Sequence, residues 1–156
     1  MLDGLNIRQA LLEDLDTLAP LFDAYRVFYA QASDPDRARA FLHERLALRE
    51  SVIFLAERHT GKGVEPVGLM QLYPGFSSVA TRRLWILNDL FVVPSARGQG
   101  VGRALLQASR EHARRTGACR VTLSTAADNV RAQGLYEDFG FHRDPDIHYA
   151  LPVDEE

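Results

Sequence analysis

The first half of the chain alternates between the two spacings that apolar residues follow in strands and in helices. Residues 5–10 are predicted as a strand, and apolar positions at helical spacing predict a helix over residues 13–30. A second helix is expected to begin with Asp34 as its N-cap and Pro35 at its first position, and to reach about Arg49. The predicted order is therefore strand, helix, helix.

The rest of the chain adds strands that are bounded by turns or by proline. Residues 51–57 and 67–73 flank His-Thr-Gly-Lys-Gly, which is typical of a β-hairpin. A long apolar strand should stop at Pro94, because proline donates no ladder hydrogen bond. That strand covers residues 82–93, and a buried strand is predicted at 118–125. Helices are predicted at 98–116, closed by Gly117, and at 129–139. The last predicted element is a hairpin formed by Phe141 and residues 147–151.

Together these elements predict one mixed α/β domain over residues 1–156. The expected architecture is one central mixed sheet with helices on both faces. No repeat, linker or low-complexity segment interrupts the pattern.

Composition and charge narrow the class of protein. Of the 156 residues 46% are apolar, enough for a real core, and the net charge of −3 gives no global signal for nucleic acid. The single cysteine, Cys119, excludes an internal disulfide, fits a reducing compartment and is expected to be a buried, inert thiol. No signal-peptide pattern or membrane-length apolar run is present, so a soluble cytoplasmic protein is expected. The five histidines lack metal-ligand spacing, so no catalytic metal is expected.

The segment after Pro94 carries the strongest chemical signal. Gly98, Gly100 and Gly102 lie between an apolar strand and a helix, an order typical of a phosphate-binding turn. A Walker loop is excluded because the only lysine, Lys62, is far away in the sequence. The dinucleotide spacing Gly-x-Gly-x-x-Gly is absent as well.

Two motifs resemble the GNAT superfamily of N-acetyltransferases. The first is Arg97-x-x-Gly100-x-Gly102, which is similar to the family's acetyl-coenzyme A pyrophosphate motif. The second is Asn129 followed seven residues later by Tyr136, with Gly140-Phe141 opening the next segment. The resemblance covers nearly the whole chain. Within the family, residues 25–29, 72–78 and 85–92 look like the histone/polyamine acetyltransferase subgroup.

The resemblance implies acetyl-coenzyme A as cofactor and a fold with a mostly antiparallel sheet of about seven strands, splayed at its middle. The pantetheine arm would lie along Phe91, Val92 and Val93, with the backbone of Phe91 and Val93 as its partners. Asn129 would either bind the pantetheine or cap its helix, and Asp128 competes for that cap. The pyrophosphate would meet the backbone of Arg97, Gly98, Gln99, Gly100, Val101, Gly102 and Arg103.

The resemblance also assigns catalytic roles. Tyr136 would be the general acid that protonates the leaving thiolate, and a ring packed on the core is the alternative role. Asp89 is the candidate base for the acceptor amine, and a purely structural role is the alternative. At the positions of Asn88 and Asp89, spermidine/spermine acetyltransferases carry Glu-Asp. Asn88 therefore departs from their pattern.

The acceptor is expected to be a primary amine of a small molecule, such as a polyamine or an amino acid. Asn88 and six aromatic residues are the candidates for binding it, namely Tyr25, Phe28, Tyr29, Tyr73, Phe76 and Trp85. Asp34, Asp36 and Glu44 would add negative charge. A position in the core fits Phe28 and Trp85 equally well. Asp34 and Asp36 could equally serve only to start the helix that begins at Pro35.

Three other functions stay open. The chain could acetylate protein lysines or N-termini, hold an acyl-coenzyme A without catalysis, or bind a nucleotide as a regulatory domain. The family resemblance also implies a homodimer.

Overall fold

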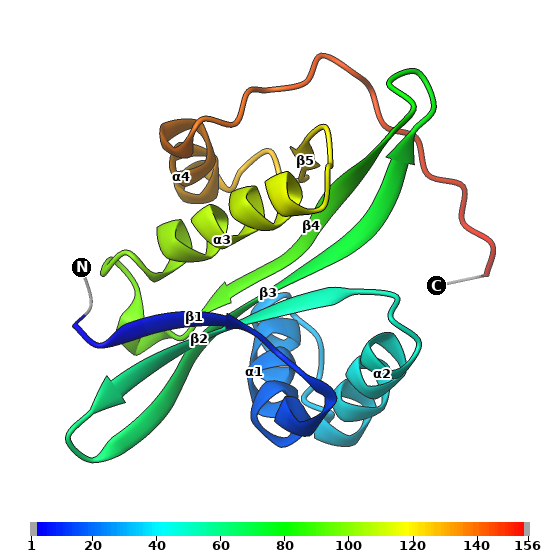
Figure 1. The fold of residues 1–156 in the computed structure, drawn as a ribbon. Coiled ribbons are helices and arrows are strands. Elements are labelled where there is room, and N and C mark those ends of the chain that lie inside the picture. The colour runs from blue at the N-terminus through cyan, green and yellow to red at the C-terminus, as the bar shows by residue number, and fades with distance from the viewer. Residues whose placement is uncertain (1–2, 155–156) are drawn as a thin grey trace. The chain divides into compact units, whose positions relative to one another are not determined.

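The computed structural model describes residues 3–154. The described residues up to Ser124 form one compact unit, and those from Thr125 onward form a second. Figure 1 shows the elements of both units.

The first unit is built on one sheet in which the strands follow chain order. The first four strands pair antiparallel, and the fifth runs parallel to the fourth. The strands are β1 (Leu5–Gln9), β2 (Val52–Thr60), β3 (Gly63–Ser77), β4 (Arg82–Val92) and β5 (Val121–Thr122).

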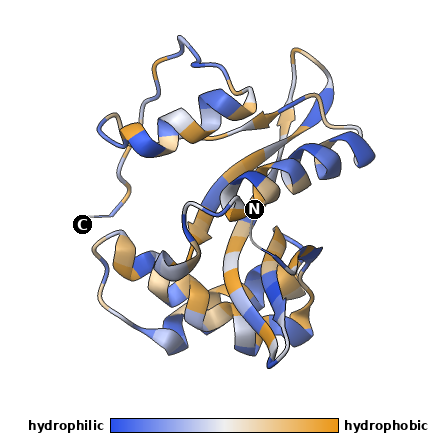
Figure 2. Ribbon diagram, turned by 90° about the vertical axis from the view of Figure 1, so that its left-hand side faces the viewer, coloured by the Kyte–Doolittle hydropathy of each residue, from blue (hydrophilic) through white to orange (hydrophobic). Residues whose placement is uncertain are grey.

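Helices cover both faces of this sheet, with α1 (Leu15–Phe28) and α2 (Pro35–Ala47) on one face and α3 (Val101–Arg115) on the other (Figure 1). The core beneath α1 and α2 contains Leu18, Leu42 and Leu69. Hydrophobic segments run along the strands, and each helix mixes hydrophobic and hydrophilic bands (Figure 2). The mixed α/β fold expected from the sequence is confirmed. The second unit holds α4 (Val130–Phe139).

The helix boundaries follow local backbone chemistry. The Asp34 carboxylate accepts a hydrogen bond from the Arg37 N–H at 3.0 Å, which confirms it as N-cap, and Pro35 is the first helical residue. Gly117 ends α3 with φ of +71°. A 3₁₀ turn, Leu12–Asp14, precedes α1, and a second one, Pro94–Ala96, follows β4.

The prediction of about seven strands is wrong, because five are present in residues 3–154. No strand forms in Phe141 or residues 147–151. Ile147, Tyr149 and Leu151 alternate as strand residues do, but they are 77%, 92% and 88% exposed. Alternation gives a segment an apolar face, whereas a strand also needs a neighbour for its backbone.

The predicted strand at 118–125 shortens to β5 and is half-buried, not buried. Backbone bonds extend it slightly, since the Cys119 N–H donates to the Arg83 carbonyl at 2.8 Å. Cys119 is itself half-buried, which corrects the expectation of a buried thiol. β5 pairs only with Trp85 and Ile86, so β4 has no strand partner on that side beyond Ile86 among the described residues.

A β-bulge at Asn88 sets which way the end of β4 faces. Gln71 pairs with Asp89 while the next residue, Leu72, pairs with Leu87, so Asn88 is the extra residue. One inserted residue reverses the alternation of side chains. Trp85 and Leu87 therefore face α3, whereas Asp89 and Phe91 face α1.

No helix in residues 3–154 has the length and apolar character that crossing a bilayer requires. No cluster of three or more histidine, cysteine, aspartate or glutamate side chains in that range is arranged to hold a metal ion.

Candidate active site

The glycine-rich turn ends in a bare helix N-terminus. Gly98 and Gly100 have φ of +72° and +87°, the left-handed region that glycine enters without a Cβ penalty. Gly100 is the N-cap of α3, so no side chain caps the first turn. The Ala104 N–H donates to the Gly100 carbonyl at 3.0 Å, and the N–H groups before it point out of the helix end. This end of α3 is therefore suited to bind an anion.

Gly102 differs from the other two glycines. It lies inside the first turn of α3 and is not among the glycines with positive φ. Its contribution is the absence of a side chain where a ligand would approach the helix end.

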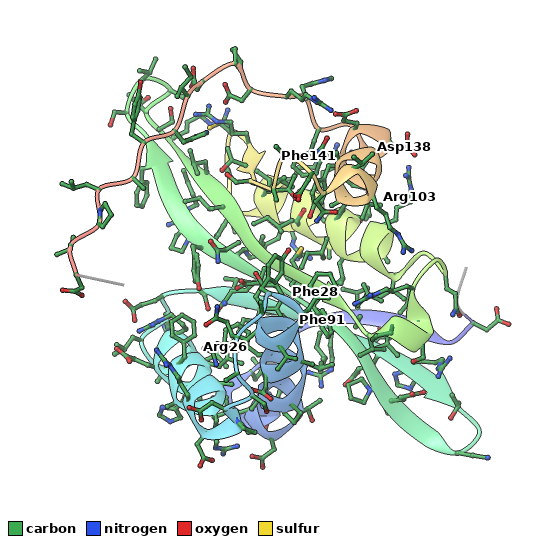
Figure 3. The ribbon with its side chains drawn as sticks, turned by 180° about the vertical axis from the view of Figure 1, so that it is seen from behind. Arg26, Phe28, Phe91, Arg103, Asp138 and Phe141 are labelled. Carbon is green, nitrogen blue, oxygen red and sulfur yellow. The ribbon has the colours of Figure 1, made fainter. Side chains whose placement is uncertain are left out.

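Side chains of the turn fold back onto the end of β4. The Arg97 Nε donates to the Val92 carbonyl at 2.9 Å. The Arg97 guanidinium lies 5.1 Å from the ring centre of Phe28 and 5.7 Å from that of Phe91, both cation–π contacts. Figure 3 shows Phe28 and Phe91 side by side where α1 meets β4. Similarly, the Gln99 Nε2 donates to the Ser95 carbonyl at 3.0 Å. These contacts hold the turn against the strand it follows.

The backbone edge of β4 that faces away from β3 belongs to Leu90 and Val92, and on this edge the Val92 carbonyl accepts the Arg97 Nε hydrogen bond. The Val93 N–H donates to the Val67 carbonyl on β3, and the Val93 carbonyl accepts from the Ala96 N–H, each at 2.9 Å. Backbone groups of an antiparallel strand alternate in direction, so Phe91, like Val93, is directed toward β3. The expectation that Phe91 and Val93 present their backbone to the pantetheine is therefore wrong by one residue.

Asp89 is a buried carboxylate held by amides. Only 4% of it is exposed, and its two oxygens accept hydrogen bonds from the Gln71 Nε2 at 2.6 Å and the Asn88 Nδ2 at 3.1 Å. Tyr25 hydrogen-bonds to Asp89 as well. Several donors are what a carboxylate needs to remain buried. Gln71 was missed by sequence reasoning, although a glutamine between Met70 and Leu72 in an apolar strand is a visible signal.

Two tyrosines share the field of Asp89. Burial raises the pKa of Tyr25, and the charge of Asp89 and its hydrogen bond raise it further. Burial also raises the pKa of Tyr73 to about 12, with the Asp89 charge adding to the rise and the Arg45 charge opposing it. Both phenols therefore stay protonated near neutral pH and can donate hydrogen bonds.

Asp89→Asn should lower the pKa of Tyr73 below its value of about 12, because the neighbouring negative charge is removed. Titration of the tyrosine ring carbons by NMR, with each signal assigned through single Tyr→Phe variants, would measure the change. An unchanged Tyr73 titration would contradict the proximity of the two groups.

The structure brings together part of the predicted aromatic set. The ring centre of Tyr25 lies 5.0 Å from that of Tyr29 and 6.3 Å from that of Phe91. Phe28 contacts Tyr29 at 5.3 Å and is 57% exposed, so it does not fill the core. Tyr73 hydrogen-bonds to Gln71, which in turn donates to Asp89.

Trp85 and Phe76 lie on the opposite face of the sheet. The Trp85 Nε1 donates to the Thr116 Oγ1 at 2.8 Å, and its ring packs 4.8 Å from that of His112 on α3. Phe76 pairs with Arg83, whose guanidinium lies over both the Phe76 and the Trp85 rings. The core position of Trp85, which is 5% exposed, fits the structural alternative.

The predicted acidic residues are mostly engaged elsewhere. Asp34 caps α2, and Asp36 lies exposed in the first turn of that helix. Glu44 forms an ion pair with Arg45 at 2.9 Å. Within residues 3–154, no hydrogen bond or ion pair joins any of the three to Asp89.

Asn129 and Tyr136 belong to the second unit. The Asn129 Oδ1 accepts from the Ala132 N–H at 3.3 Å, so Asn129, and not Asp128, caps α4. Tyr136 is half-buried on α4, with its ring 5.9 Å from that of Phe141. Its role as general acid stays a prediction.

Comparison with known proteins identifies the family. The profile of the Acetyltransferase (GNAT) family matches residues 15–141. The chain belongs to the GNAT family of acetyltransferases. The uncharacterized N-acetyltransferase YhfO of Bacillus subtilis (strain 168) is 49% identical over 150 residues, covering 96% of this chain and 98% of that one.

Solved structures agree with the GNAT assignment. The crystal structure of a probable acetyltransferase superposes with a TM-score of 0.89 at 46% identity, covering 97% of this chain and 99% of the other. An aminoglycoside N-acetyltransferase in complex with coenzyme A has a TM-score of 0.77 at 19% identity, covering 96% and 95% of the two chains. The latter likeness shows the fold alone.

Proposed function

We propose that this GNAT protein transfers an acetyl group from acetyl-coenzyme A to a primary amine of a small molecule. The observation that carries the proposal is the sequence of features along β4 and α3. A buried carboxylate at a bulge, an open strand edge and an uncapped helix N-terminus follow one another within residues 88–102.

Cofactor binding would use backbone more than side chains. The N–H groups of residues 98–103 and the positive end of α3 suit a pyrophosphate, whereas the Arg97 N–H already donates to the Pro94 carbonyl at 3.3 Å. The backbone groups of Leu90 and Val92 suit the amides of the pantetheine arm, which pair as a strand does. Asn129 would contribute its Nδ2, since its Oδ1 caps α4. The bound coenzyme in a related fold supports this choice of cofactor.

Acceptor activation would depend on Asp89 and Tyr25. An alkyl ammonium with a pKa of about 10 must lose a proton before its nitrogen can attack. Tyr25, half-buried and hydrogen-bonded to Asp89, can take that proton on its oxygen while passing its own hydroxyl proton to the carboxylate. Asp89 thus serves as the base through Tyr25.

Acetyl-coenzyme A supplies a thioester, whose carbonyl carbon accepts the amine and whose sulfur leaves. As the carbon–nitrogen bond forms and the carbon–sulfur bond breaks, Tyr136 would give its hydroxyl proton to the sulfur. The second proton of the amine nitrogen would leave to solvent, and solvent would return a proton to Tyr136. The motif that includes Asn129, Tyr136 and Gly140-Phe141 supports this role.

The alternatives differ in the acceptor. Acetylation of peptide lysines or N-termini would use the same chemistry on a larger partner. A non-catalytic acyl-coenzyme A module would bind the cofactor and leave amines unchanged. The resemblance to the histone/polyamine subgroup keeps polyamines among the acceptors to test.

A panel of amines, with free thiol as readout, tests the proposal. It should include spermidine, diamines, amino acids, aminoglycosides and a lysine peptide. Thiol release with a small amine supports the proposal, and release with the peptide alone supports the protein acetyltransferase. Cofactor binding without release from any acceptor would overturn catalysis in favour of the binding module.

A further inference from the structure

A hollow lies on the same face of the sheet as Asp89, beside the C-terminal end of α2. It has a volume of about 570 Å³ and is lined by Phe41, Arg45, Arg49, Glu50, Tyr73 and Pro74. Tyr73 connects it to the candidate active site, because its hydroxyl group hydrogen-bonds to Gln71, two residues away on β3, and Gln71 donates to Asp89 at 2.6 Å. The hollow is therefore an extension of the acceptor side.

Arg49 occupies a backbone position that favours glycine. The Glu50 N–H donates to the Arg45 carbonyl at 2.9 Å and the Arg49 N–H to the Leu46 carbonyl at 3.2 Å, the two bonds of a Schellman motif. In that motif the residue at Arg49 adopts a left-handed conformation, and its φ is +54°. The chain thus carries a long cationic side chain where the backbone would prefer no side chain at all.

The positive charges of the hollow are not equally engaged. Arg45 pairs with Glu44 at 2.9 Å and with Glu50 at 3.0 Å, and its guanidinium lies 4.7 Å from the Phe41 ring centre. Within residues 3–154, no ion pair or side-chain hydrogen bond joins Arg49 to another residue. One guanidinium at the hollow is therefore available to a ligand.

The charges along this face have a direction. A negative carboxylate lies inside, at Asp89, whereas two guanidinium groups and one carboxylate, that of Glu50, line the hollow. Glu50 pairs with Arg45, so the charge of Arg49 is the one left unbalanced there. A ligand that is positive at one end and negative at the other matches this order. A polyamine, which is positive at both ends, would place an ammonium group beside arginines.

We propose that the hollow binds an anionic group of the acceptor, so that the substrate is an amine that also carries a carboxylate or a phosphate. Arg49 binds the anion, and the amine is directed toward Asp89 and Tyr25. The proposal rests on the proposed function, because it assigns the acceptor class of that same site.

Matched acceptor pairs test the inference. Each amino acid is compared with the amine left when its carboxylate is removed, for example ornithine with putrescine and phenylalanine with phenethylamine. Phosphoethanolamine and ethanolamine are the pair that tests a phosphate in place of the carboxylate. The wild-type protein should give a kcat/KM at least about tenfold higher for one anionic class than for the partners that lack the anionic group.

Substitution of Arg49 should remove this preference without harming the fold. Arg49→Gly suits the left-handed backbone, so Tm should stay level or rise while the preference drops about tenfold. Arg49→Glu should lower it further by repelling the anion. Arg114→Glu is the matched control, since Arg114 is exposed on α3, on the other face of the sheet.

The possible outcomes separate the two proposals. If amines are acetylated and neither the anionic group nor Arg49 affects kcat/KM, the acceptor inference is overturned while the acetyltransferase stands. If no amine yields thiol, the proposed function itself has failed. A preference that survives in Arg49→Gly and Arg49→Glu would contradict the assignment to Arg49.

Discussion

Gly98→Asp is expected to weaken acetyl-coenzyme A binding roughly 100-fold. The turn at Gly98 would hold the pyrophosphate next to backbone N–H groups, and a carboxylate added there would face that negative charge. Two unit charges about 5 Å apart at an effective dielectric constant near 20 repel by about 3 kcal/mol, which is roughly two orders of magnitude in Kd. Calorimetric titration of the variant would measure the loss.

Gly117→Asp provides a closely matched control for this change. Gly98 and Gly117 have φ of +72° and +71°, and a Cβ at either position meets nothing within 4 Å. Both variants therefore carry the same backbone strain, but Gly117 lies at the opposite end of α3. Equal losses of stability with unequal losses of affinity are expected. Similar affinities in the two variants would refute the role of the turn.

Tyr136→Phe is expected to lower kcat about 10²- to 10⁴-fold, the range typical of removing a general acid. The Kd for acetyl-coenzyme A should change little, because the substitution removes only a hydroxyl group. A steady-state assay with an acceptor from the amine panel, together with a cofactor titration, would separate the two quantities.

Tyr149→Phe is the companion variant, since Tyr149 belongs to the same unit and is 92% exposed. Its kcat should match that of the wild type. If Tyr136→Phe also retains full kcat, the hydroxyl does not protonate the leaving thiolate, and its ring has only a packing role.

Local chemistry made much of the fold predictable from the sequence. Asp34 and Pro35 mark the start of α2, and Gly117 marks the end of α3, because caps depend on a few neighbouring residues. The turn from Pro94 to Gly102 was predicted on the same basis.

Features that depend on distant pairing were not predictable in this way. The bulge at Asn88 exists only relative to Gln71 and Leu72 on the neighbouring strand, yet it determines which face carries Asp89. The same pairing decides that Leu90 and Val92, and not Phe91 and Val93, present their backbone at the open edge.

Only part of the candidate acceptor site could be predicted from the sequence, because the rest also depends on how distant strands pair. Tyr25, Phe28 and Tyr29 recur along a single helix, so their proximity follows from helical spacing. Trp85 lies apart from these three residues because its side chain is on the face of the sheet that α3 covers, which the sequence did not show. Arg49 gave no signal in the sequence, because its position in a left-handed turn appears only once α2 is seen to end there.

The central claim is that the segment from β4 to α3 binds acetyl-coenzyme A, and calorimetric titration of the unmodified protein tests it most directly. The account predicts saturable binding of one acetyl-coenzyme A per chain, with ATP at the same concentrations giving much weaker binding. Absence of binding by acetyl-coenzyme A, or equal affinity for ATP, would contradict it.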